Sequence, residues 1–266
     1  MSKRETITAI IPAHNEEQNI ERCIKSLDWC DEVTVVWMGS DKTGRIAKNL
    51  GARVVIRNQT KGSNWQKVQE NINWAIDESK TDWIIRVDAD EEITRKLKDE
   101  ILAVLERDSD AKNPDNFVAY GIPRNQYFFG SFLKGGDWAH DRLVRLFRRP
   151  AARYENFVRI HEQFVVEGKV GYLKGKINHY SHPTLTAAME KFNSYTSTEI
   201  YDHHELFGKA LYNMFTQPLY IFLRWMIWHQ GFRDGIRGIV AGAYRAWYEF
   251  MLWSKYLEKL NTKKAK

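Results

Sequence analysis

The apolar run Trp83-Ile84-Ile85-Arg86-Val87 is followed at once by the acidic stretch Asp88-Ala89-Asp90-Glu91-Glu92. A short apolar run bounded by polar residues predicts a buried strand. In open α/β folds, ligands bind at the carboxyl ends of the strands, so acids placed there predict a site. Asp88 and Asp90 would share one face of a continuing strand, where a divalent cation bridging to a phosphate would relieve their repulsion. A solvated acidic turn ahead of a helix is the alternative that this segment leaves open.

Around this stretch, strand-like and helix-like segments alternate through the first part of the chain. This order predicts an α/β fold of Rossmann-like type, with a mostly parallel central sheet, helices on both faces and right-handed crossovers. The predicted strands are 6–12, 33–37, 53–57 and 83–87, and the predicted helices are 15–29 (with Asn15 as N-cap), 41–50 (closed by Gly51), 64–80 and 94–107.

After residue 110 the alternation ends. Strand-like segments at 117–123, 141–148 and 160–166 predict an antiparallel extension, and helical patterns follow at 184–205, 209–229 and 233–259. We therefore expect a catalytic domain over 1–205, made of halves 1–110 and 111–205, and a C-terminal helical region over 206–266.

Composition places the chain among globular proteins, with 43% hydrophobic and 28% charged residues. Two cysteines, Cys23 and Cys30, are typical of reduced thiols in a cytosolic protein. The first residues lack the apolar core of a signal peptide. The formal charge of +6 resides wholly in residues 205–266, so we expect an anionic partner for that region rather than for the whole protein.

The last predicted helix is amphipathic, since Ile236, Ile239, Tyr244 and Trp247 recur at helical spacing with Arg245 opposite. Neither of the last two helices reaches the roughly 20 apolar residues of a membrane span. We expect both to lie on an anionic membrane surface at the inner face of the cell membrane. The alternative is a helical hairpin that packs on the catalytic domain or on another subunit. Nucleic-acid binding is disfavoured, because the basic excess accompanies an apolar helical face and no groove-reading motif.

Three motifs occur in order on the predicted parallel strands: Ile10-Ile11-Pro12-Ala13-His14-Asn15-Glu16-Glu17, Gly39-Ser40-Asp41-Lys42-Thr43 and Val87-Asp88-Ala89-Asp90-Glu91. This order resembles family 2 of the glycosyltransferases, which have the GT-A fold. Later stretches at 142–149, 158–162, 179–183, 191–195 and 231–238 look like the branch of that family that includes lipopolysaccharide-core β-1,4-glucosyltransferases.

The resemblance implies a UDP-sugar donor. The residues that it places at the nucleotide-sugar are Pro12, Ala13, Glu16, Asp41, Asp88 and Ala89. Asp41 has an alternative role as the cap of the next helix. Trp37 stands where the family usually has an acid that recognises the base; it either stacks on a base or, as we favour, packs against the sheet.

The resemblance also implies an inverting transfer with Mg²⁺ or Mn²⁺ as cofactor. Asp90 would ligate the metal, with Asp88 contacting the ribose or the hydrated metal. His179 would complete the metal shell or bind phosphate, the alternative being a structural histidine. Glu162 stands at the position of the catalytic base, which takes a proton from the acceptor hydroxyl; the alternative is a structural ion pair.

The acceptor side is implied at Asp137, Trp138 and Arg142, beside Asp141, and Trp138 would stack on a sugar ring. A surface loop anchored by Trp138 is the alternative. A basic cluster follows, which would meet acceptor phosphates or, as we favour, form a solvated strand face. Its members are Arg145, Arg148, Arg149 and Arg153.

The sequence thus predicts a metal-dependent inverting transferase that moves a hexose such as glucose to a lipid-linked or lipopolysaccharide-core glycan acceptor. Two alternatives remain open. A nucleotidyltransferase on a similar sheet would usually carry a loop rich in Gly and Arg or Lys after the first strand, where this chain has Pro12–Glu17. A non-catalytic binding protein of the same fold is kept open by Trp37.

Overall fold

The computed structural model describes residues 4–57, 65–108, 116–140, 142–155, 164–182 and 184–264. The chain divides into two compact units. The first comprises Met1–Arg124 and Arg142–His179, and the second comprises Asn125–Asp141 and Tyr180–Lys266.

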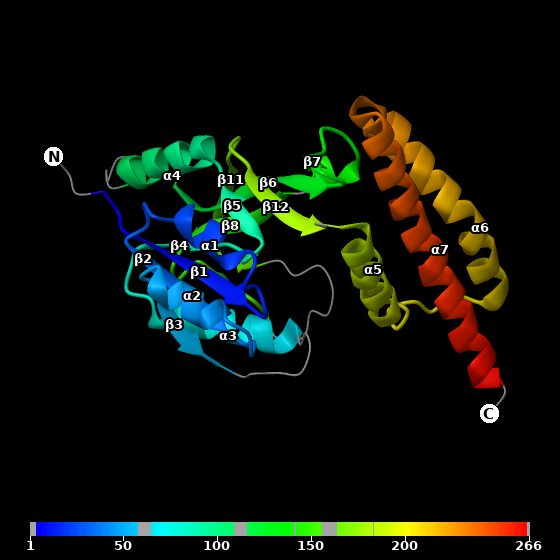
Figure 1. The fold of residues 1–266 in the computed structure, drawn as a ribbon, viewed down its shortest axis with the longest axis horizontal. Coiled ribbons are helices and arrows are strands. Elements are labelled where there is room, and N and C mark those ends of the chain that lie inside the picture. Colours follow the sequence, from blue (N-terminus) through cyan, green and yellow to red (C-terminus); the bar gives the residue numbers. More distant parts are fainter. Residues whose placement is uncertain are drawn as a thin grey trace. The chain divides into compact units, whose positions relative to one another are not determined.

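The first unit contains the predicted parallel sheet (Figure 1). Its four parallel strands are β1 (Ile7–Ala13), β2 (Glu32–Trp37), β3 (Arg53–Ile56) and β4 (Trp83–Arg86), in the order β3-β2-β1-β4. Each strand lies within two residues of its predicted bounds, which confirms the α/β fold class.

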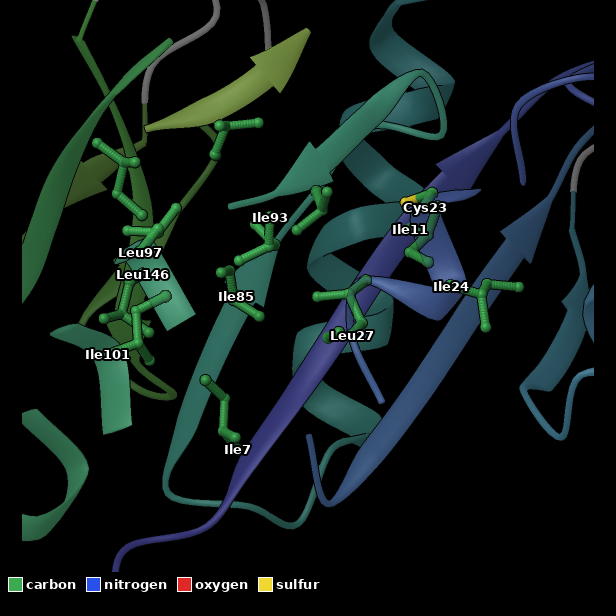
Figure 2. Packing of buried hydrophobic residues seen from close by; sticks show 14 of the residues in the cluster. Ile7, Ile11, Cys23, Ile24, Leu27, Ile85, Ile93, Leu97, Ile101 and Leu146 are labelled. Carbon is green, nitrogen blue, oxygen red and sulfur yellow. The ribbon is translucent and has the colours of Figure 1, made fainter. Parts of the chain in front are cut away.

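The first four helices are α1 (Ile20–Lys25), α2 (Thr43–Asn49), α3 (Trp65–Glu78) and α4 (Arg95–Asp108). Alternate residues of β1 enter two different cores, because successive side chains of a strand point to opposite faces. Ile11 packs in one core with Ile24 of α1, as Figure 2 shows, and Ile10 packs in the other with Ile72 of α3. Helices therefore cover both faces of the sheet, as predicted.

The start of α1 differs from the prediction. Asn15 has a φ of +58°, which is the left-handed region and not the conformation of an N-cap. The helix begins at Ile20, with Asn19 as its N-cap residue. Gly51, by contrast, follows α2 with a φ of +86°, as predicted.

The antiparallel extension is also present. β8 (Arg142–Arg148) pairs antiparallel with both β4 and β6 (Phe117–Phe128), and β12 (Ile177–His182) pairs antiparallel with β5 (Glu91–Ile93). The remaining strands are β7 (Ser131–Phe132), β9 (Ala152–Arg153), β10 (Val165–Val166) and β11 (Lys169–Tyr172). The predicted strand at 160–166 falls mostly outside the described residues.

The second unit is largely helical, with α5 (Leu185–Glu199), α6 (Phe207–Leu223) and α7 (Ile236–Lys264). α6 and α7 run side by side as an antiparallel pair, and α5 packs on α7 (Figure 1). The short helices of this unit are η1 (Asp137–His140), the π-helical η2 (Arg224–Trp228) and η3 (Gly231–Asp234). Of the helices that the structure describes, none combines the length and the apolarity needed to cross a bilayer.

Trp225 organises the turn between α6 and α7. Its side chain is fully buried. A Cβ added at Gly136, Gly231 or Gly242 would lie 2.3, 2.4 and 2.8 Å from atoms of the indole ring, respectively. Glycine is therefore required at these three positions for the backbone to approach the ring.

Truncation of the sheet core should be costly. We expect Ile85→Ala to lower the free energy of unfolding by about 2–5 kcal/mol, because the fully buried side chain of Ile85 leaves a cavity. Ile56→Ala is the matched control, since Ile56 is 62% exposed and its loss should change stability by only about 0.5 kcal/mol. Urea unfolding followed by tryptophan fluorescence measures both, and equal losses would contradict the placement of β4 in the core.

Candidate functional site

The predicted motifs meet at one edge of the sheet. β1 is parallel to both β2 and β4, so the loops that follow these three strands leave from the same edge. This is the edge at which open α/β sheets bind ligands.

The loops after β1 and β2 are joined by hydrogen bonds. The side-chain oxygen of Asn15 accepts a hydrogen bond from the Ser40 backbone N–H at 2.9 Å. The backbone N–H of Glu16 donates to the Thr43 hydroxyl at 2.8 Å. The left-handed backbone of Asn15 therefore serves to bring the first loop against the second.

Pro12 and Ala13 are the last residues of β1, and both are buried. They pair with Val36 and Trp37 of β2 in the parallel ladder. Glu16 lies in the loop, where its carboxylate accepts a hydrogen bond from the side chain of Asn19 at 2.9 Å. The nucleotide contacts expected of Pro12, Ala13 and Glu16 stay predictions.

Asp41 is held in place by backbone groups. Its carboxylate accepts hydrogen bonds from the N–H of Thr43 at 3.0 Å and from that of Glu17 at 3.1 Å. Partial burial opposes ionisation, yet the hydrogen bonds from Thr43 and Glu17 keep the pKa of Asp41 below its usual value. Asp41 therefore orders the turn ahead of α2, whose N-cap residue is Lys42, and its contact with the nucleotide stays a prediction.

Trp37 packs on α2. A Cβ added at Gly44 would lie 2.5 Å from the indole ring, so the ring lies directly against the helix backbone. The side chain is part of the sheet core, which is the interpretation that the sequence favoured. Its buried Nε1 has no hydrogen-bond partner within the described part of the chain.

The first part of the acidic stretch, Asp88 to Asp90, forms a tight turn after β4, and Glu91 begins β5. β4 ends at Arg86, and the backbone N–H of Glu91 donates to the carbonyl of Asp88 at 2.9 Å. The expectation that Asp88 and Asp90 share a strand face was therefore wrong. The alternative of a solvated turn was wrong as well, because Glu91 is fully buried and Ala89 is 3% exposed.

Asp88 is the anionic partner of two arginines. Its Oδ1 lies 2.8 Å from Nη2 of Arg86, and its Oδ2 lies 2.7 Å from Nη2 of Arg145. Arg145 is 1% exposed, so the expectation that it lies on a solvated strand face was wrong. A buried arginine requires an acidic partner, and for Arg145 this partner is 57 residues away in the sequence.

Glu91 has a different electrostatic state. Burial, followed by the negative charge of Asp88, raises the pKa of Glu91 to about 8, and Arg124 opposes this change. Arg145 lies 2.7 Å from Asp88 but 3.4 Å from Glu91. The guanidinium of Arg145 is therefore closer to the carboxylate of Asp88 than to the side chain of Glu91.

Asp90, in the turn before β5, and His179 of β12 lie close together. Oδ2 of Asp90 lies 3.4 Å from Nε2 of His179, which β12 places opposite Glu91 of β5. His179 is buried, and its Nδ1 has no hydrogen-bond partner among the residues that the structure describes. A carboxylate oxygen and an imidazole nitrogen at this separation are two adjacent donors for a cation.

These donors fit a metal shared with a substrate better than an all-protein metal cage. The described parts of the chain contain no group of three or more His, Cys, Asp or Glu side chains that could hold a metal ion. Mg²⁺ is typically bound by one or two carboxylates and completes its shell with phosphate oxygens and water. Asp90 and His179 would supply the protein part of such a shell, and their contact with a metal stays a prediction.

The catalytic-base candidate Glu162 lies in 156–163, outside the described residues, as does Asp141. Of the acceptor-side candidates, the exposed Arg142 has its guanidinium 5.8 Å from the ring centroid of Tyr172. Its role stays a prediction.

The other two acceptor-side candidates belong to the second unit. Asp137 pairs with Arg224 at 2.7 Å. Trp138 packs edge-on against Trp225, with ring centroids 5.0 Å apart, so it does anchor its loop. Stacking of Trp138 on a sugar stays a prediction.

Two further members of the predicted basic cluster are also paired. Arg148 lies 3.0 Å from the carboxylate of Glu5, and Arg153 pairs with Asp77. Three of the four arginines of the cluster therefore form ion pairs with acids of the first unit, of which the Arg153–Asp77 pair lies on the surface.

Comparison with known proteins decides the family. Residues 8–180 match the family model described as glycosyl transferase family 2. The chain belongs to glycosyl transferase family 2. This family-2 enzyme is a glycosyltransferase, as predicted.

Its relatives support this assignment over the whole chain. It is 28% identical over 262 residues to the lipopolysaccharide core biosynthesis glycosyltransferase LpsC of Rhizobium meliloti, with 95% of this chain and 92% of LpsC covered. An uncharacterised glycosyltransferase of Rickettsia typhi is also 28% identical, over 95% of this chain and 87% of its own.

The structure of Staphylococcus aureus TarS 1–349 shares the fold of this family-2 glycosyltransferase. The TM-score is 0.52 at 12% identity, with 97% of this chain and 92% of that chain covered. TarS 1–349 in complex with UDP-GlcNAc gives a TM-score of 0.51 at 13% identity, with the same coverage.

The neutral state of Glu91 has a consequence for stability. Because its folded pKa of about 8 exceeds the ordinary 4.5, the folded state keeps a proton that the unfolded chain loses between these values. Stability should therefore fall as pH rises through this window, by at most about 1.4 kcal/mol per pH unit. Urea unfolding of the wild type and Glu91→Gln across this range measures the effect. The glutamine variant should lack this slope, and an identical slope in both proteins would show that Glu91 is ionised when folded.

Proposed function

We propose that this glycosyltransferase moves a hexose from a UDP-sugar to a lipid-linked or lipopolysaccharide-core glycan, with inversion and with Mg²⁺ or Mn²⁺ as cofactor. TarS, which shares the fold, is known as a complex with UDP-GlcNAc. LpsC, which matches nearly the whole chain, is named for lipopolysaccharide core biosynthesis. Such an acceptor places the enzyme in the cytoplasm, peripherally on the inner face of the cell membrane.

The observation that carries the donor site is the approach of Asp90 to His179 at the carboxyl edge of the parallel strands. Both oxygens of Asp88 already have arginine partners, so we assign the main metal contact to Asp90. Asp88 then acts at the ribose or through the water shell of the metal. The loops after β1 and β2, joined through Asn15 and Ser40, would form the walls of the nucleotide site.

The reaction needs one proton acceptor and one group that stabilises the leaving diphosphate. A bound divalent cation supplies the second by neutralising the developing negative charge. Glu162 would take the proton of the acceptor hydroxyl while the oxygen of that hydroxyl forms the new bond to the anomeric carbon. Attack from the face opposite the leaving UDP inverts that carbon. Asp90 and His179 would hold the cation that contacts the diphosphate of the donor. They would therefore affect both the binding of the donor and the departure of UDP.

Loss of the Asp90 carboxylate should abolish metal-dependent donor binding. We expect wild-type protein to bind UDP in calorimetry far more tightly with Mn²⁺ than without it, and Asp90→Ala and Asp90→Asn to lose at least about tenfold in affinity. Asp28→Ala is the matched control, since this acid is 72% exposed and pairs with Lys98 on the surface. Unchanged UDP binding in Asp90→Asn would remove Asp90 from the metal site.

Glu162→Gln separates donor binding from chemistry. The amide keeps the shape of the side chain but cannot accept the proton, so we expect kcat to fall by about 10²–10⁴-fold while UDP affinity is kept. Radiolabelled transfer from UDP-hexoses to lipopolysaccharide-core acceptors measures the rate. A near-full rate would exclude Glu162 as the base. Release of pyrophosphate in place of UDP would favour the nucleotidyltransferase alternative.

A further inference from the structure

The second unit carries an extended apolar surface on α6, on the turn that follows it and at the start of α7. Large hydrophobic side chains recur there and are well exposed, among them Leu219 at 62% and Trp228 at 71%. We call this surface the apolar–basic face. Its apolar members are Phe207, Leu211, Tyr212, Phe215, Leu219, Tyr220, Leu223, Ile227, Trp228, Phe232, Ile236 and Ile239.

Other side chains form the buried interior of the hairpin. α6 turns a different row inward, in which Ala210 and Ile221 are buried, and Trp225 of η2 is fully enclosed. The exposed row follows every fourth residue through Phe215 and Leu219, which is one continuous ridge on a helix. An apolar patch of this extent on a folded domain marks an interaction surface.

The charge on this face has one sign. Between residues 206 and 248 the chain has five basic residues and one acidic residue, Asp234. The carboxylate of Asp234 accepts hydrogen bonds from the backbone N–H groups of Lys134 and Gly135, at 2.8–3.0 Å. Lys209, Arg233 and Arg237 are exposed beside the apolar side chains.

We infer that the apolar–basic face docks on the surface of a bilayer that contains anionic phospholipid. An interfacial helix buries its apolar side among the acyl chains and places Lys and Arg at the headgroups, with Trp and Tyr at the boundary. Each cation near such a surface contributes roughly fivefold to binding. This inference rests on the membrane location proposed above and not on the identity of the donor.

A second copy of the chain fits the same face less well. A twofold contact places the same patch of both copies together. Arg233 and Arg237 of each copy would then approach those of the other, and Asp234 is already engaged by backbone groups. Lipid phosphates supply the missing negative charge.

Vesicle co-sedimentation of the full chain tests the inference, with vesicles of phosphatidylcholine alone or mixed with phosphatidylglycerol. We expect wild-type protein to bind the mixed vesicles at least about tenfold more tightly. Phe215→Ser combined with Leu219→Ser should lose at least about tenfold on mixed vesicles. The triple variant Lys209→Gln, Arg233→Gln, Arg237→Gln should lose the preference for phosphatidylglycerol.

Ile56→Ser is the matched control, because Ile56 is as exposed as Leu219 but lies on β3 of the first unit. It should bind vesicles like the wild type, and circular dichroism shows whether every variant is folded. Wild-type protein that binds neither vesicle, or a folded Phe215/Leu219 variant that binds like the wild type, would overturn the inference. So would a wild-type dimer in light scattering that this variant abolishes, in the absence of vesicle binding.

The two proposals fail separately. A protein that binds mixed vesicles but neither UDP nor a UDP-sugar would refute the donor assignment and leave the apolar–basic face in place. A protein that transfers sugar to a soluble core acceptor but binds no vesicle would refute the docking surface and the membrane location, and would leave the transferase assignment in place.

Discussion

The acidic turn depends on the two ion pairs that Asp88 forms with Arg86 and Arg145. The antiparallel register pairs Ile85 of β4 with Leu146 of β8, and Arg86 and Arg145 are the neighbouring residues on the two strands. Two cations facing each other across a strand pair repel, unless an anion lies between them. Asp88 is that anion, with one guanidinium at each oxygen, 2.8 and 2.7 Å away. Since β8 joins the parallel and antiparallel halves of the sheet, the turn is fixed at that junction.

As a result, the three neighbouring acids Asp88, Asp90 and Glu91 have different partners. Asp88 has an arginine at each carboxylate oxygen, whereas burial raises the pKa of Glu91 to about 8 and keeps Glu91 neutral at neutral pH. Asp90 is turned toward His179 instead. A cation held by Asp90 would therefore not need the oxygens of Asp88 that bind the arginines. The same acidic stretch would behave differently on a strand without the two arginines, which is why the motif alone does not determine its chemistry.

Periodicity was sufficient to predict the four parallel strands of the first unit and the presence of the helices that follow them, because buried strands and amphipathic helices leave repeating patterns. The short strands β5, β11 and β12 were not predicted. Features that depend on distant partners were not predictable in this way. The local sequence predicts Asn15 as an N-cap, but its side chain accepts a hydrogen bond from the Ser40 backbone and its own backbone is left-handed. Arg145 reads as a solvated strand residue, but its partner Asp88 is 57 residues away. Motif order found the edge of the sheet that holds Asp90, and the pairing of β12 with β5 was needed to bring His179 there.

The apolar–basic face of the second unit does not form part of the core that holds the helical hairpin together. Trp225 fills the interior of the turn, where Gly136, Gly231 and Gly242 let the backbone close over the ring. Trp138 packs against the same indole, so this apolar core is completed from within the unit. Exposed apolar side chains on α6 add nothing to that core and carry a cost in solubility. A protein that keeps a continuous ridge of them, flanked by arginine and lysine, has a use for it outside its own fold.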